Sequence, residues 1–175
     1  MRRWGDLLGL AAAALITLGI GGCYKSDAPL VAPSQAVYPF TTLRFADQDG
    51  QKSIIRREGD RYLYAEEPDK PEVQPNTTSL LLYAIEDNFY LVQADDEGAQ
   101  VYMFAKRDGD KITFASLCEA ADPAVLKQLG IERPKEDEIL PAECKVEDLN
   151  ALIAIGRSPA SWTKSTTTVT ILSME

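Results

Sequence analysis

The part of the chain that most constrains its fold lies between residues 40 and 117, where short runs rich in aromatic and β-branched residues alternate with acidic or glycine-containing turns. The runs occupy residues 40–46, 52–57, 61–66, 78–86, 89–94, 100–106 and 111–117. They recur at about the spacing of eight to twelve residues that antiparallel strands with short turns produce. The pattern predicts a β-meander.

One run, residues 78–86 (TSLLLYAIE), is apolar on both sides of the expected strand. Alternate side chains point to opposite faces of a sheet, so Leu80 and Leu82 face one way while Leu81 and Tyr83 face the other. This strand is therefore expected to be central and covered on both faces.

Helical signals follow the strands and supply a candidate cover. Residues 122–130 begin with an aspartate cap and a proline and end in glycine, and residues 146–155 place Leu149, Leu152 and Ile153 on one helical face. Residues 166–173 (TTTVTILS) favour a last strand. The predicted fold class is α+β: an antiparallel β-meander sheet, about two short helices towards the C-terminus, and a final strand.

The N-terminus combines a basic head, an apolar run over residues 7–20, and the sequence Ile20-Gly21-Gly22-Cys23. The apolar run is short for a membrane-spanning helix and has the length of a signal-peptide core. The whole segment resembles a bacterial lipoprotein signal peptide, with IGGC as its lipobox. The resemblance implies cleavage before Cys23, a diacylglycerol on its sulfur and a further acyl chain such as palmitate on its amino group.

Two alternatives to lipidation remain open: an ordinary secretory signal, or an uncleaved membrane anchor. With lipidation, two or more acyl chains hold the mature chain firmly to a membrane without spanning it. Because Tyr24 rather than aspartate follows the cysteine, the family sorting rule indicates the outer membrane, with the domain facing the periplasm. The expected organisation is a signal peptide (1–22), a lipidated N-terminus and flexible proline-bearing tether (23–39), and one α+β domain (40–175).

The remaining chain is acidic. The 175-residue chain carries a formal net charge of −9, which becomes −10 when residues 1–22 are removed. Such a chain repels phosphate backbones and anionic lipid surfaces, so nucleic acid is not an expected partner. A basic protein is the partner that this charge favours, although an acidic surface also serves solubility alone.

Two cysteines remain after Cys23 is assigned to the lipid. In an oxidising compartment Cys118 and Cys144 are expected to form a disulfide, the alternative being two buried free thiols. The chain contains no histidine, and the spacing of the cysteines is not that of a zinc site, so no metal or cofactor is expected.

Catalytic signals are weak. A serine or cysteine nucleophile lacks a histidine base, and the SxxK and GxSxG motifs do not occur. The neighbouring pairs Glu66–Glu67 and Asp95–Asp96 cannot be told apart from other surface carboxylates. Residues 47–50 (DQDG) imitate the start of a calcium loop, but the strands on either side favour a hairpin turn. The chain is therefore not expected to be an enzyme.

Aromatic residues are the one suggestive feature of the predicted strands. Five tyrosines are candidates for a recognition face, or are ordinary half-buried strand residues: Tyr62, Tyr64, Tyr83, Tyr90 and Tyr102. The favoured function is a membrane-anchored envelope lipoprotein that serves as a non-catalytic protein-binding or assembly module in the periplasm. The alternatives are an envelope enzyme that uses carboxylates, and an inhibitor of a basic cell-wall hydrolase such as lysozyme.

Overall fold

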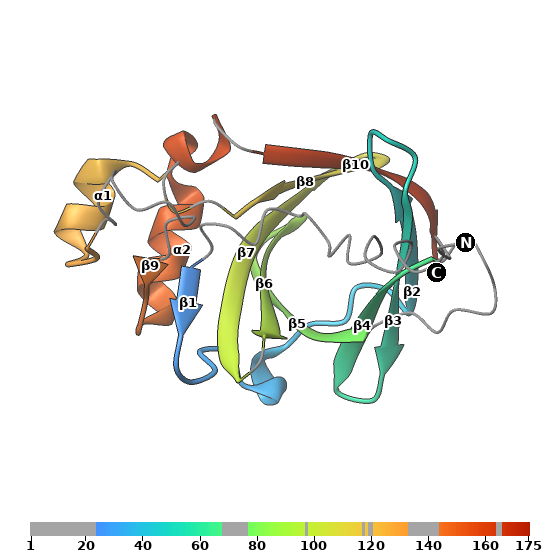
Figure 1. The fold of residues 1–175 in the computed structure, drawn as a ribbon, viewed down its shortest axis with the longest axis horizontal. Helices are drawn as coiled ribbons and strands as arrows, with labels where there is room; N and C mark the ends of the chain where they lie inside the picture. The colour runs from blue at the N-terminus through green and yellow to red at the C-terminus, as the bar shows by residue number, and fades with distance from the viewer. Residues whose placement is uncertain are drawn as a thin grey trace, which may run out of the picture.

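The computed structural model describes residues 24–67, 77–96, 98–116, 118, 121–132, 144–163 and 166–175. Its main element is a closed barrel of antiparallel strands, which Figure 1 shows arranged around a central space, with the helices on one side. The barrel strands are β2 (Thr42–Ala46), β3 (Lys52–Glu58), β4 (Arg61–Glu66), β5 (Thr77–Glu86), β6 (Phe89–Asp96), β7 (Ala99–Asp108), β8 (Lys111–Ala115) and β10 (Thr166–Met174).

The prediction of an α+β meander sheet is wrong, because the meander closes on itself. Strands β2 to β8 pair with their sequence neighbours as expected, and β10 then joins the two free edges. It pairs with β8 through Val169 and Ile112, and with β2 through Ile171 and Phe45. The result is an eight-stranded barrel, and the described residues contain two short α-helices beside it. Closure depends on a pairing between strands far apart in sequence, which alternation within each strand does not reveal.

Both faces of β5 are covered, which confirms the interpretation of residues 78–86. Leu80 and Leu82 are buried in the core inside the barrel. Leu81 and Tyr83 pack instead against a second core, which lies between the outer face of the barrel and the helices. The barrel's own far wall covers one face of this strand, and the helical segment covers the other.

The helices of the second core begin at aspartate caps. Helix α1 (Pro123–Gln128) is capped by Asp122, as predicted, and Gly130 beyond it has a positive φ of 69°. Helix α2 (Leu149–Arg157) begins three residues later than expected, because Asp148 is its cap. A short 3₁₀ turn, η3 (Pro159–Trp162), follows it. None of the helices in the described ranges has the length and apolarity needed to cross a membrane.

Helix α2 approaches the barrel closely at Gly156. A β-carbon at this position would lie 2.6 Å from the ring of Phe104 on β7. Trp162 packs edge-on against Phe89, with ring centroids 5.6 Å apart, and its indole N–H donates to the Gly156 carbonyl oxygen at 2.8 Å. The glycine therefore provides the space for the aromatic rings that join α2 to the barrel.

Residues 24–39 do not form the flexible tether that the proline content suggests. Strand β1 (Tyr24–Ser26) pairs with β7 just beyond the part of β7 that pairs with β8. The short strand β9 (Cys144–Lys145) pairs with β1 in parallel. Tyr24 and Val31 are almost fully buried. A 3₁₀ turn, η1 (Pro33–Gln35), then leads towards β2.

Two buried polar side chains on the outer face of the barrel hold this N-terminal segment. The side-chain oxygen of Gln93 accepts hydrogen bonds from the backbone N–H groups of Leu30 and Val31, at 3.1 and 2.8 Å. The hydroxyl of Tyr102 accepts from Leu30 N–H at 3.0 Å and bonds to the Ser26 hydroxyl at 2.8 Å. These contacts make residues 24–31 part of the folded domain.

Candidate functional site

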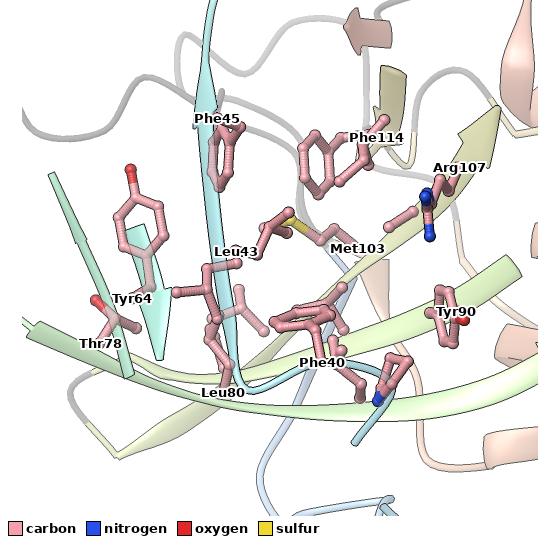
Figure 2. Close-up of a pocket in the computed structure, with 18 of the residues that line it drawn as sticks. Phe40, Leu43, Phe45, Tyr64, Thr78, Leu80, Tyr90, Met103, Arg107 and Phe114 are labelled. Carbon is pink, nitrogen blue, oxygen red and sulfur yellow. The ribbon is translucent and has the colours of Figure 1, made fainter. Parts of the chain in front are cut away.

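The interior of the barrel contains a cavity of about 220 Å³. Side chains from the inner faces of the strands line it, and Figure 2 shows them pointing towards a common space. Most of them are apolar, including Leu43, Phe45, Leu80, Val92, Met103 and Phe114. The site therefore consists of core positions that the barrel leaves incompletely filled.

The cavity exists because one wall carries small side chains. Ala94 and Ala105 point inwards from β6 and β7, and β6 lies across the barrel from β2, which contributes the large ring of Phe45. Phe45 packs against the rings of Phe114 and Tyr64, with centroids 6.3 and 6.4 Å away. The ring of Phe45 thus lies between those of Tyr64 and Phe114, and the small side chains of Ala94 and Ala105 leave space on the β6–β7 side.

Residues 37–40 cross one end of the barrel. The Val37 N–H donates to the Leu82 carbonyl oxygen at 2.8 Å, and the Tyr62 hydroxyl donates to the Phe40 carbonyl oxygen at 2.7 Å. The Phe40 ring lies 4.6 Å from the Tyr62 ring, measured between centroids, and it lines the cavity. These residues form part of the wall where the cavity reaches this end.

The same end of the barrel carries Arg107, the one basic side chain among the described residues that line the cavity. The β3–β4, β5–β6 and β7–β8 turns also lie at this end, which we call the arginine mouth. Figure 2 shows Arg107 and Tyr90 on the same side of the cavity, across from Tyr64 and Thr78. The Arg107 Nε–H donates to the Gly109 carbonyl oxygen at 3.1 Å, and its side chain is in no ion pair with a residue of the described ranges.

The opposite end, which we call the acidic mouth, carries the β2–β3 and β6–β7 turns. Asp95 and Asp96 line the cavity there. The Asp95 carboxylate accepts a hydrogen bond from the Gln100 side-chain amide at 3.0 Å. Asp47 lies in the β2–β3 turn, where its carboxylate accepts from the N–H groups of Asp49 and Gln51, both at 2.9 Å. This confirms a hairpin turn at residues 47–50.

Burial raises the pKa of two tyrosines on the inner face. For Tyr62 and Tyr64, desolvation favours the neutral phenol and raises the pKa above its usual value of about 10. Hydrogen bonds to the Phe40 backbone and to Ser53 oppose this effect only in part. Both phenols are therefore neutral at physiological pH and act as hydrogen-bond partners within the wall.

The five tyrosines singled out from the sequence do not share an exposed face. Tyr62, Tyr64 and Tyr90 point into the barrel, whereas Tyr83 and Tyr102 lie on its outer side against the second core. Tyr62, Tyr64 and Tyr102 are buried. Their distribution follows from strand alternation, which divides them between the two cores.

The predicted disulfide between Cys118 and Cys144 is present. It joins the chain beyond β8 to strand β9, and both cysteines belong to the second core. It therefore fixes the helical side of the molecule to the barrel. The proposed lipidation site, Cys23, lies outside the described residues.

Sequence reasoning missed the residues of the cavity, although part of the signal was available. Alternate residues of β7 point into the barrel: Val101, Met103 and Ala105 are apolar, and Arg107 at the end of the series is a cation. That pattern acquires meaning only in a closed barrel, where the series faces an interior. Within the described part of the chain, no group of three or more acidic or cysteine side chains is arranged to hold a metal ion.

Comparisons of the chain with protein-family models, curated proteins and solved structures gave no match. The assignment of function therefore depends on the geometry of the barrel.

Proposed function

We propose that this protein is a non-catalytic binding protein of the bacterial cell envelope whose barrel holds an apolar small molecule. The supporting observation is the cavity of about 220 Å³ with apolar side chains on most of its wall. Small eight-stranded barrels have interiors that are either filled by side chains or wide enough for one small ligand. Ligand sites in proteins are typically apolar and carry a few polar groups, as this one does at its two mouths.

The cavity volume limits the size of the ligand. An apolar cavity of about 150 Å³ holds benzene, which has six carbon atoms. In proportion, the cavity of about 220 Å³ accommodates about nine carbon atoms. Burying nine methylene groups contributes at most about 7 kcal/mol at 0.8 kcal/mol each, so the expected Kd is no tighter than on the order of 10 µM.

The proposal retains the lipid anchor and the non-catalytic role expected from the sequence, with the lipidated Cys23 holding the domain at the outer membrane on its periplasmic side. It replaces the expected protein partner by a small ligand. Two observations support this choice: the five candidate tyrosines are divided between two cores, and the cavity offers an apolar site.

Titration with nonanol tests the proposal, because this neutral alcohol matches the cavity in size. The protein for this experiment begins at residue 23, with Cys23→Ser to prevent lipidation, since all described strands and helices lie after that position. We expect saturable binding of one nonanol per chain in isothermal titration calorimetry. Absence of saturable binding would refute a barrel that holds a neutral apolar molecule.

A cavity-filling variant locates the bound molecule. Ala105→Leu adds three carbon atoms at a buried position that lines the cavity. It should weaken nonanol binding at least tenfold, and an unchanged or raised thermal midpoint would show that the barrel remains folded. Ala154→Leu makes the same change on the exposed side of α2 and should leave binding unchanged. Equal affinities of the two variants would place nonanol outside the barrel.

A further inference from the structure

The charges that line the cavity are separated by sign. Asp95 and Asp96 lie at the acidic mouth, whereas Arg107 lies at the arginine mouth. Asp95 pairs with Gln100, which is seven residues before Arg107 on β7. At about 3.3 Å per residue, the two ends are roughly 23 Å apart along the strand, more than the screening distance of about 10 Å at 0.1 M salt. Of the described side chains that line the cavity, a ligand head group therefore meets carboxylates at one end and a guanidinium at the other.

Arg107 is well placed to receive an anion. Its guanidinium has five N–H donors, and only the Nε–H is used within the described residues, by the Gly109 carbonyl oxygen. Arg57 of β3 is a second arginine at this end of the barrel. Its guanidinium carbon lies over the Tyr38 ring, 4.0 Å from the ring centroid. At the same end of the barrel the Glu86 carboxylate is paired with Arg157 at 3.0 Å. Asp87, Asp108 and Asp110 lie in or beside the β5–β6 and β7–β8 turns without lining the cavity. The remaining Arg107 donors therefore have no acidic partner in the described residues.

We propose that the ligand, if the barrel holds one as argued above, is a single-chain amphiphile of about nine carbon atoms with an anionic head group. The chain lies among the apolar side chains, and the head group lies at the arginine mouth against Arg107, with the Tyr90 hydroxyl as a second donor. A carboxylate and a phosphate monoester share this chemistry, because the planar donor fork of arginine matches both.

The overall acidity of the protein does not contradict an anionic ligand. The charges at the acidic mouth are screened before they reach the arginine mouth, whereas a head group in contact with Arg107 is screened much less. The same charges set the direction of binding, because an anionic head placed at Asp95 and Asp96 meets like charge. The reversed orientation suits a cationic head group, which the experiment below includes.

Titrations with four probes of equal chain length test the inference: nonanol, nonanoate, nonyl phosphate and nonylammonium. Nonanoate or nonyl phosphate should bind about tenfold more tightly than nonanol, and their advantage should decrease at high salt. The stronger of the two anions indicates whether a fatty acid or a phosphate ester is the better model. Nonylammonium binding as tightly as the anions, or more tightly, would overturn the proposal.

Two arginine variants assign the effect to one side chain. Arg107→Gln should abolish the preference for the anions and leave nonanol affinity within about twofold, because glutamine keeps much of the side-chain length. Arg56→Gln removes the same charge from the exposed outer side of β3 and should keep the full preference. A preference that survives Arg107→Gln would refute the assigned head-group site.

The four titrations separate this inference from the proposed function. Saturable binding of nonanol without a preference for anions sustains the apolar cavity and overturns the anionic ligand. Failure of all four probes to bind overturns both.

Discussion

Gly156 is expected to be intolerant of even the smallest side chain. The change Gly156→Ala would place a methyl group 2.6 Å and 2.7 Å from two ring carbons of Phe104, and 3.0 Å from the Phe89 ring. Carbon atoms pack favourably at about 3.5–4.0 Å, so the neighbours must move by roughly 1 Å. Phe104 is almost fully buried and contacts the rings of Tyr24 and Trp162 as well, so its ring has little room to move.

Two effects of this substitution oppose each other. Alanine favours a helix over glycine by up to about 1 kcal/mol, which stabilises the protein. Overpacking of a buried site costs about 1–3 kcal/mol. With the full gain in helix propensity subtracted, we expect the free energy of unfolding to fall by up to about 2 kcal/mol, which corresponds to a decrease in Tm of up to about 6 °C for a chain of this size.

Urea denaturation followed by circular dichroism measures the change. Ala154→Gly is the matched control, because it lies on the exposed side of the same helix and reports the helix propensity alone. It should cost about 0.5–1 kcal/mol. If Gly156→Ala instead stabilises the protein by the amount that Ala154→Gly destabilises it, the steric argument is wrong and the contact between α2 and β7 is looser than described.

Three further predictions concern the cysteines and the buried phenols. Replacing Cys118 and Cys144 by alanine should lower the free energy of unfolding by about 3.5 kcal/mol, the chain-entropy value for this loop, and an unchanged urea midpoint would contradict it. Cys23→Ser in the full chain should move the protein from the membrane to the soluble fraction; retention in the membrane would refute lipid anchoring. Because burial raises the pKa of Tyr62 and Tyr64, their contribution to stability should be fully present below about pH 10 and be lost as pH rises through the raised values. A urea midpoint that stays level throughout alkaline titration would contradict this burial effect.

Local features of the fold could be predicted because they depend on neighbouring residues. The strands and their turns follow from alternation and from glycine and acidic residues, and β4 has the predicted bounds. The cap of α1 at Asp122 was predicted for the same reason. Helix α2 starts later than the apolar pattern predicts, because Asp148 is its cap and not a residue of its first turn.

Features that depend on distant pairing were missed. Closure of the barrel requires β10 to join β2, and Thr170 and Ala46, which face each other there, are more than a hundred residues apart. The cavity depends in turn on closure of the barrel. The small side chains of Ala94 and Ala105 leave an enclosed space only when other strands lie opposite them. Prolines and weak periodicity do not reveal that residues 24–31 are held in the fold, because the hydrogen bonds that hold them come from the distant side chains of Gln93 and Tyr102.

The position of β1 determines how a lipid anchor would hold this protein. Tyr24, the first residue of β1, is buried and directly follows the cysteine proposed to carry the lipid. A free tether of 16 residues would reach roughly 50 Å when extended, whereas a single residue spans less than about 4 Å. If Cys23 is lipidated, almost no linker separates the folded domain from the membrane. The domain then stays at the membrane surface, whereas a long flexible linker would let it move away. Ligand exchange would then take place at the surface of the membrane in which the protein is anchored.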